Sequence, residues 1–355
     1  MNGTYRPLWL NESGDLEVID QRYLPFENRE RVLKTASDAC EAIADMTVRG
    51  AGVIGNVAAF GVYLAARQFP NDKSAIHAEA AKIRASRPTA VNLMWAVDRM
   101  LNVVKSSDDV VADTLAEAIA ICDEDVLRSQ RMGEIGCDII ESIMQEKGLT
   151  SFNILTHCNA GWLAIIDNGS ALAPIYEAKR RGIDIHVWVD ETRPRNQGAN
   201  LTSWELLDAG IKHTIIPDNT GGHLMQHGLV DMVITGADRV TRQGDAANKI
   251  GTYLKALAAK DNHIPFYIAL PLSTFDTGTK DGITEIEIEQ RCEDEVHTVR
   301  GINENGIPQN LRITPIGSKA ANYGFDVTPA RLISGLITEA GCIPANEAAI
   351  MAKLC

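Results

Sequence analysis

The sequence predicts an α/β protein with a smaller, mainly helical N-terminal domain and a C-terminal domain built on a doubly wound, Rossmann-like parallel sheet. Its 355 residues are more than twice the roughly 150 residues of an average domain, so we expect two domains. Hydrophobic residues make up 45% of the chain and aromatic residues only 5%, which favours an interior of Ala, Ile, Val and Leu over a β-sandwich. From residue 151 onward, short apolar runs alternate with helical segments, as they do in parallel sheets.

The N-terminal domain is expected to span residues 1–125, and the α/β domain residues 126–355. Residues 7–22 contain two apolar runs around a turn signal and predict a β-hairpin. Residues 28–46 and residues 107–147 carry apolar side chains at helical spacing. A hairpin followed by packed helices is therefore predicted before the parallel sheet begins.

A glycine-rich helix is predicted over residues 48–66, with Arg49 before it and Gly50, Gly52 and Gly55 near its start. Glycines let backbone amides approach an anion, and a helix N-terminus carries a partial positive charge. The alternative use of these glycines is close helix packing. Their spacing also matches Gly-x-Gly-x-x-Gly, but a helix rather than a strand precedes it, so no dinucleotide cofactor is indicated.

A second helix, over residues 86–100, is also expected to begin beside an arginine. Pro88 fits the first helical turn, and Arg87 lies just outside it. Two guanidinium groups at two helix starts suggest a phosphate site, because arginine binds phosphate through two parallel hydrogen bonds. Ordinary surface arginines are the alternative.

Five parallel strands are predicted in the α/β domain, and a polar stretch follows each of them. The fourth strand stops at Gly236, and Asn248, Lys249 and Ile250 are expected to open the next helix. The predicted strands cover residues 152–161, 183–194, 211–219, 230–235 and 264–271.

Polar side chains collect where these strands end. In an open α/β sheet, ligands bind outside the carboxyl ends of the strands. The alternative is a set of capped loops with surface ion pairs, although a capped loop needs one polar group rather than several. The polar residues that the pattern gathers there are Cys158, Asp190, Glu191, Asp238, Asn248 and Lys249.

Cys158 is the candidate nucleophile or base, because a thiolate forms readily beside positive charge. Its alternative is a small core side chain. The neighbouring His157 could act as a base or pack into the strand. The chain has no Ser-His-Asp order with a nucleophile elbow and no zinc-ligand spacing, so no metal is expected. A cysteine paired with an aspartate suggests acid/base chemistry on a small substrate.

The charge and the cysteines limit the partners. A net charge of −13 with no basic run argues against nucleic acid and anionic membranes as partners. No apolar segment reaches the roughly 18 residues that span a bilayer, and the N-terminus lacks a signal-peptide core. Seven widely spaced cysteines without a Cys-x-x-Cys pair indicate reduced thiols in the cytoplasm.

Six motifs together resemble the methylthioribose-1-phosphate isomerase family. That family shares a superfamily with the regulatory subunits of eukaryotic initiation factor 2B and with ribose-1,5-bisphosphate isomerase. The resemblance covers nearly the whole chain. It rests on residues 49–55 (RGAGVIG), 87–100, 154–161 (ILTHCNAG), 190–206, 236–253 and 264–276.

The resemblance implies an isomerase that converts 5-methylthioribose 1-phosphate to 5-methylthioribulose 1-phosphate in methionine salvage, without a metal or an organic cofactor. Cys158 and Asp238 match the catalytic pair of the family. A homodimer is also implied, since members of the superfamily pair through the α/β domain. The positions that match the family's substrate and phosphate contacts are Arg49, Gly50, Ala51, Arg87, Gln197, Asn248 and Lys249.

Some departures from the family leave the 5-substituent of the sugar open. The family usually has RGAPAIG at residues 49–55 and a small residue at Trp162, and residues 283–296 also differ. A 5-deoxyribose 1-phosphate or another 5-substituted pentose 1-phosphate would satisfy the same chemistry. Ribose 1,5-bisphosphate would need a second phosphate site. The alternative to an enzyme is a regulatory subunit that senses sugar phosphates without catalysis.

The expected chemistry begins with ring opening. A sugar with phosphate on its anomeric oxygen cannot open to a free aldehyde, so a proton must be delivered to the ring oxygen. Asp238 is the expected acid. Hydrogen then moves from C2 to C1, either as a proton through Cys158 or as a hydride, and a dry pocket to which Trp162 contributes would favour the hydride.

Overall fold

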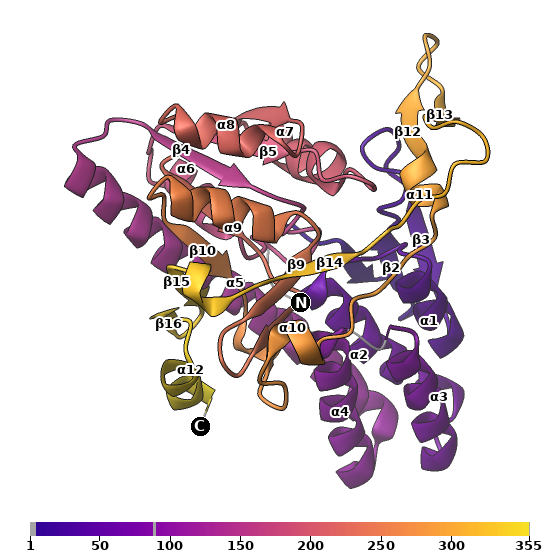
Figure 1. Ribbon diagram of the computed structural model, residues 1–355. Coiled ribbons are helices and arrows are strands. Elements are labelled where there is room, and N and C mark those ends of the chain that lie inside the picture. The colour runs from indigo at the N-terminus through magenta and orange to yellow at the C-terminus, as the bar shows by residue number, and fades with distance from the viewer. Residues whose placement is uncertain (1–4, 88–89, 355) are drawn as a thin grey trace.

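The computed structural model describes residues 5–87 and 90–354 and confirms the predicted fold class (Figure 1). A small antiparallel sheet and a bundle of helices form the N-terminal part, and a parallel sheet with helices on both faces follows. The N-terminal elements are β1 (Leu8–Leu10), β2 (Leu16–Ile19), β3 (Glu30–Leu33), α1 (Ala36–Ala44), α2 (Ala51–Gln68), α3 (Lys73–Ala85), α4 (Val91–Ser106) and α5 (Val110–Lys147).

The predicted hairpin is confirmed as β1 and β2, but the helix predicted over residues 28–46 is too long. Its first part is strand β3, which pairs with β2 so that Leu33 lies opposite Leu16. A capping box then starts α1, in which the Thr35 hydroxyl accepts from the Asp38 backbone N–H and the Asp38 carboxylate accepts from the Thr35 N–H. Because a strand can hold apolar residues that also fit helical spacing, the pattern alone did not separate β3 from α1.

Helix α2 is the centre of the N-terminal core, and it is buried on nearly all sides. A Cβ on Gly52 would lie 2.9 Å from the Ile165 side chain, and one on Gly55 would lie 3.1 Å from the Asn92 carbonyl oxygen. Close helix packing therefore explains these two glycines. Helix α4 begins at Val91 rather than near residue 86, and the predicted role of Pro88 lies outside the described residues.

Helix α5 joins the two parts of the molecule. Ala118 and Cys122 lie in the core of the N-terminal helices, whereas Cys137 and Ile140 lie in the core on one face of the parallel sheet. The predicted boundary between residues 125 and 126 falls inside this continuous helix and stays a prediction.

The large sheet has seven strands in the order β16-β15-β10-β7-β4-β5-β6, and only β16 at one edge is antiparallel. The chain starts at the central strand β4, adds β5 and β6 on one side, and then returns to add β7, β10 and β15 on the other. This is a doubly wound sheet whose order reverses between β4 and β7. The strands are β4 (Phe152–Thr156), β5 (Ile185–Asp190), β6 (Lys212–Ile216), β7 (Met232–Thr235), β10 (Phe266–Ala269), β15 (Gly335–Thr338) and β16 (Gly341–Ile343).

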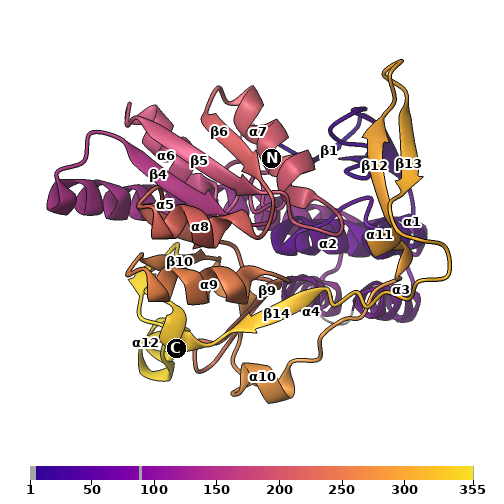
Figure 2. The ribbon, with the colours of Figure 1, turned by 45° about the horizontal axis from the view of Figure 1, so that its top comes forward.

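Helices cover both faces of this sheet (Figure 2). One buried core joins the sheet to α5, α6 and α7, and the other joins it to α8 and α9. A short π-helix (Gly198–Thr202) runs directly into α7. The helices of this part are α6 (Ala173–Arg180), α7 (Ser203–Asp208), α8 (Thr220–Gln226), α9 (Thr252–Asp261) and the C-terminal α12 (Glu347–Leu354).

The helix predicted to open at Asn248 and Lys249 is wrong, since both residues lie on a strand. Strand β9 (Ala246–Lys249) pairs with β14 (Phe325–Thr328), which comes from far downstream. Local spacing cannot reveal such a distant partner. Helix α9 begins only after Gly251, whose φ of +106° is not a helical conformation. The Asp326 carboxylate accepts hydrogen bonds from the Gly251 and Tyr253 N–H groups. These helix-start amides are therefore not free for a ligand.

The remaining elements form the rim of the molecule. Strands β11 (Phe275–Asp276) and β8 (Arg239–Thr241) complete a four-stranded sheet with β9 and β14. A hairpin of β12 (Thr298–Ile302) and β13 (Pro308–Arg312) projects from the body beside the N-terminal part (Figure 1). Two single turns, α10 (Gly282–Glu285) and α11 (Asp294–His297), precede it. Of the helices that the structure describes, none has the length and apolar character to cross a membrane.

Candidate active site

Cys158 and Asp238 follow the two strands between which the sheet order reverses, Cys158 after β4 and Asp238 after β7. Cys158 is buried and has a φ of +65°, a left-handed conformation that few non-glycine residues adopt. Two threonines hold it there, since the Cys158 N–H donates to Thr192 Oγ1 at 2.8 Å and the Cys158 carbonyl accepts from Thr202 Oγ1 at 2.7 Å. A strained residue fixed in this way is typical of functional sites.

The charges around Cys158 come from three different elements. Burial raises the pKa of the Cys158 thiol, Arg49 and Lys249 act to lower it, and Asp238 acts to raise it. The groups that act on the Cys158 thiol are Asp238, the other residue of the predicted pair, and two of the predicted phosphate-binding cations.

Lys249 is almost fully buried beside Cys158. Its ammonium donates to the Gly324 carbonyl at 2.8 Å and lies 4.7 Å from the centre of the Phe325 ring. Burial lowers the pKa of Lys249, and the Cys158 and Asp238 charges oppose that shift. Because an ammonium has three donors, a bound anion can still receive hydrogen bonds from it.

Arg49 reaches the site from the start of α2 and is held by Asn159. Its guanidinium donates to the Asn159 carbonyl at 2.7 Å and also to the Asn159 side-chain oxygen. The adjacent Gly50 has a φ of +90°, and a Cβ there would lie 2.5 Å from Ala164, so this position requires glycine. A glycine turn and an asparagine therefore hold Arg49, a predicted phosphate-binding residue, next to the segment that contains Cys158.

Behind Asn159 lies Glu205, a buried carboxylate that the sequence analysis did not single out. Its Oε1 accepts from Asn159 Nδ2 at 2.8 Å and from the Leu163 N–H at 3.2 Å, and its Oε2 accepts from the Trp162 N–H at 2.9 Å and the Tyr176 hydroxyl at 2.8 Å. Burial raises the pKa of Glu205, while these hydrogen bonds act to lower it. Its place within the motif at residues 190–206 was the one available signal.

Asp238 and Arg87 face the same small cavity. Burial lowers the pKa of Arg87, and the carboxylates of Asp238 and Glu289 oppose that shift. The Arg87 guanidinium lies 3.9 Å from Glu289. The cavity has a volume of about 30 Å³, and its walls are mostly apolar. It is lined by Ala51, Ile54, Arg87, Ala90, Asp238, Arg239, Ala247, Ile286, Glu287 and Phe325.

A second, more polar cavity of about 300 Å³ includes Arg49 and Gln197 in its lining and extends toward β12 and β13. Gln197 is buried, and its side-chain oxygen has no hydrogen-bond partner among the described residues. The predicted site residues are thus divided between two cavities. Ala51, Arg87 and Asp238 line the first, and Arg49 and Gln197 line the second. Cys158, Asn248 and Lys249 line neither cavity, and Asn248 donates to Thr252 Oγ1 at 2.9 Å.

Trp162 does not line the cavity beside Asp238, contrary to the expectation that it helps to form a dry pocket there. Its ring packs against Tyr5 and Trp204, with centroid distances of 5.6 and 5.7 Å, and lines a separate cavity. Glu205 accepts from the Trp162 N–H, and the ring packs with Tyr5 and Trp204 instead of lining the cavity beside Asp238. The apolar walls of the cavity beside Asp238 come instead from Ile54, Ile286 and Phe325.

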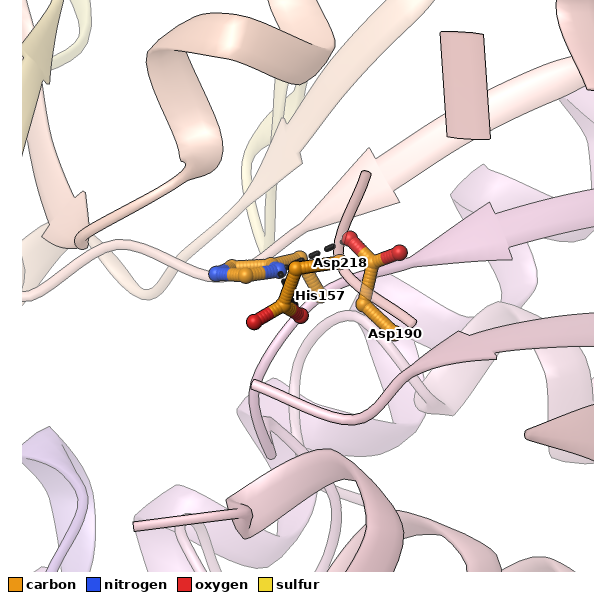
Figure 3. A group of neighbouring side chains, drawn as sticks. All are labelled: His157, Asp190 and Asp218. Carbon is orange, nitrogen blue, oxygen red and sulfur yellow. Dashed lines mark hydrogen bonds and ion pairs between the residues drawn. The ribbon is translucent and has the colours of Figure 1, made fainter. Parts of the chain in front are cut away.

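His157 and Asp190 are buried beneath the site, and Asp218 lies next to them (Figure 3). Their ligand atoms are close enough for a metal ion to bind. The ammonium of Lys255, however, already lies 3.0 Å from Asp190 Oδ2, the same oxygen that contacts His157 Nδ1 at 2.8 Å. A divalent ion would have to displace this ammonium, so the cluster is a hydrogen-bonded support rather than an open metal site.

Comparison with known proteins gives two concordant results at the level of sequence. Residues 44–345 match the model of the Initiation factor 2 subunit family. Methylthioribose-1-phosphate isomerase from Sulfurimonas denitrificans is 60% identical over 98% of this chain and 97% of the relative. The protein of the same name from Desulfosudis oleivorans is 52% identical over 98% of this chain and 96% of the relative.

Solved structures agree in fold. A crystal structure of 5-methylthioribose 1-phosphate isomerase from Pyrococcus horikoshii matches with a TM-score of 0.84 and 36% identity, covering 99% of this chain and 96% of that one. A structure from A. fulgidus, titled as the delta subunit of translation initiation factor eIF-2B, matches with a TM-score of 0.80 and 35% identity. That match covers 98% of this chain and 100% of the other.

We expect Glu205→Gln to lower the free energy of unfolding by about 3 kcal/mol, because the new amide N–H groups would face two hydrogen-bond donors in a buried site. Tyr176→Phe is the matched control, since it removes one hydrogen bond to the same carboxylate and should cost only about 1 kcal/mol. Urea unfolding measures both. Equal, small losses in the two variants would show that the Glu205 carboxylate does not hold this network.

Proposed function

The chain belongs to the Initiation factor 2 subunit family and, within it, to the methylthioribose-1-phosphate isomerases, and we propose that Cys158 and Asp238 carry its reaction. It is an aldose-ketose isomerase that converts 5-methylthioribose 1-phosphate to 5-methylthioribulose 1-phosphate, a step of methionine salvage. Identity of 60% over 98% of the chain carries this conclusion. The meeting of a cysteine, an aspartate and buried cations at the reversal of strand order supports the assignment of the site.

Asp238 is the acid that opens the sugar ring. The phosphate on the anomeric oxygen prevents spontaneous opening, so a proton must reach the ring oxygen as the C1–oxygen bond breaks. Asp238 lines the small cavity together with Arg87, and this places its carboxyl group beside a candidate phosphate-binding cation. Hydrogen then passes from C2 to C1, as a proton through Cys158 or as a hydride.

Arg49, Arg87 and Lys249 supply the positive charge for the phosphate. Each is buried or nearly so in a protein of net charge −13, and they come from the starts of two helices and the end of β9. Desolvated cations bind a phosphate dianion more strongly than exposed ones, because water no longer screens them. Gln197, with its unpartnered side-chain oxygen, can accept from a substrate hydroxyl.

We also propose that the protein works in the cytoplasm as a homodimer that pairs through the α/β domain. Light scattering at micromolar concentration should give twice the 38.6 kDa chain mass. A mass of one chain would contradict the dimer.

We expect wild-type protein to convert methylthioribose 1-phosphate, and Cys158→Ser and Asp238→Asn each to lower turnover by at least about 100-fold, the usual effect of losing an acid/base group. Cys292→Ser and Asp261→Asn are matched controls on exposed residues and should keep full turnover. A substrate panel with methylthio, deoxy, hydroxy and phospho groups at C5 fixes the preferred sugar.

Near wild-type turnover in either variant would remove that residue from the mechanism. Absence of turnover on every pentose 1-phosphate would favour the second candidate, a regulatory subunit. The likeness to the A. fulgidus structure titled as an initiation factor subunit is the observation behind that candidate.

Arg87→Ala should raise KM by about 10- to 100-fold, because one charge-assisted hydrogen bond in a buried site is worth roughly 1.5–3 kcal/mol. A smaller fall in kcat is expected if the contact is equal in ground and transition states. Inorganic phosphate should compete with substrate in the wild type and much less in the variant. Arg84→Ala, which removes an exposed arginine paired with Asp98, is the control. Equal inhibition of wild type and Arg87→Ala would show that Arg87 does not contact the phosphate.

A further inference from the structure

His157 joins the two halves of the candidate site through one imidazole ring. Its side chain has no exposed surface. Nδ1 lies 2.8 Å from Asp190 Oδ2, and Nε2 lies 2.8 Å from the carbonyl oxygen of Ile250. A carbonyl oxygen can only accept, so Nε2 carries the proton and donates it to Ile250. The ring therefore links the end of β4, which holds Cys158, to the turn that follows Lys249.

The turn after Lys249 is shaped to receive this ring. Gly251 has a φ of +106°, and a Cβ there would lie 2.9 Å from His157 Cε1 and 3.1 Å from Nε2. On the other side of the turn, Asp326 accepts from the Gly251 N–H at 2.7 Å. The peptide between Ile250 and Gly251 is thus held by His157 at its carbonyl and by Asp326 at its N–H.

Asp190 and Asp218 connect the same ring to Cys158 by a second route. Lys255 on α9 lies 3.0 Å from Asp190 Oδ2 and also donates to the Asp218 carbonyl. The Asp218 carboxylate accepts from the Thr192 N–H at 2.7 Å, and Thr192 Oγ1 accepts from the Cys158 N–H at 2.8 Å. These contacts connect the ends of β4, β5 and β6 with the start of α9. Figure 3 shows the three of these side chains that lie together, His157, Asp190 and Asp218.

We propose that His157 is a positioning residue that fixes Lys249, and with it the phosphate end of the substrate, at a set distance from Cys158. The inference rests on the proposed function, because it takes Cys158 and Lys249 as members of the active site. Lys249 is held by its hydrogen bond to Gly324 and by the pairing of β9 with β14. Neither of these contacts involves a residue of β4. β9 also pairs with β8, and the Asp238 N–H donates to the Ala247 carbonyl, so β9 is tied to β7 as well. The hydrogen bond from His157 to Ile250 is the direct contact between the residue before Cys158 and the residue after Lys249.

Two substitutions at the same position separate this role from general support. In His157→Gln the amide nitrogen can occupy the place of Nε2 and keep the bond to Ile250, whereas in His157→Asn it occupies the place of Nδ1 and keeps only the contact with Asp190. We expect His157→Asn to weaken the binding of inorganic phosphate, measured by calorimetry without substrate, by about 10-fold. His157→Gln should stay within about threefold of wild type. KM should follow the same order.

His186→Asn is the matched control. His186 lies on β5 near the opposite end of the sheet, where it contacts Thr214, and its loss should leave phosphate binding unchanged. A role limited to stability would lower the melting temperature of both His157 variants without changing the affinity of the folded fraction for phosphate. Equal phosphate affinity in His157→Asn, His157→Gln and wild type would overturn the inference.

A measurement on the wild-type protein covers the case in which His157→Asn does not fold. Neutron diffraction should show a proton on His157 Nε2 directed at the Ile250 carbonyl, and a bare Nε2 would overturn the inference. Phosphate binding without isomerase activity would refute the proposed function and leave the link between His157 and Lys249 standing. No phosphate binding by the wild type would remove Lys249 as a phosphate ligand and overturn the inference itself.

Discussion

The reversal of strand order between β4 and β7 is the constraint on which the candidate site depends. Because the chain adds strands on one side of β4 and then on the other, the connections that leave β4 and β7 go to opposite faces of the sheet. Cys158 follows β4 and Asp238 follows β7, so the reversal places both residues at the carboxyl ends of neighbouring strands. Arg49, which precedes the N-terminal helix α2, lines the second cavity and donates to Asn159 next to Cys158, so this contact joins the two parts of the molecule.

Burying a cation costs solvation free energy, which hydrogen bonds or ion pairs must offset. Within the part of the chain that the structure describes, Arg49, Arg87 and Lys249 each have only one or two such partners. Arg49 is held by a neutral asparagine rather than by a carboxylate, so most of its charge remains available to a ligand. Lys249 donates to a backbone carbonyl, which again leaves its charge unpaired. Arg87 lies 3.9 Å from Glu289, a loose contact that a phosphate can replace. Arg49 and Lys249 donate to uncharged partners, so their charge can act on a bound anion, whereas Arg87 is shared with Glu289.

Two buried acids, Glu205 and Asp190, hold the residues of the candidate site in place. Glu205 orients Asn159, which orients Arg49, and Asp190 orients His157 and Lys255. The supporting acids accept hydrogen bonds from backbone amides or buried cations, as buried carboxylates must if burial is not to destabilise them. Asp190 and Glu191 illustrate the difference between neighbours, since Asp190 is fully buried in the support while Glu191 is only partly buried. The polar residues at the strand ends therefore divide into those that face the substrate space and those that hold them in place.

The sequence by itself determined the fold class, the hairpin, the glycine-led helix α2, and the strands that carry Cys158 and Asp238, because each depends on side-chain patterns over fewer than about 20 residues. Only the tertiary structure decided that Asn248 and Lys249 lie on a strand, because their partner β14 is distant in the chain. It also decided that Trp162 lines a cavity separate from that of Asp238 and that Glu205 supports Arg49 through Asn159, since both follow from contacts among segments that approach one another only after folding. Local patterns report which face of an element is buried, whereas the partner of a buried polar group is set by the packing of the whole chain.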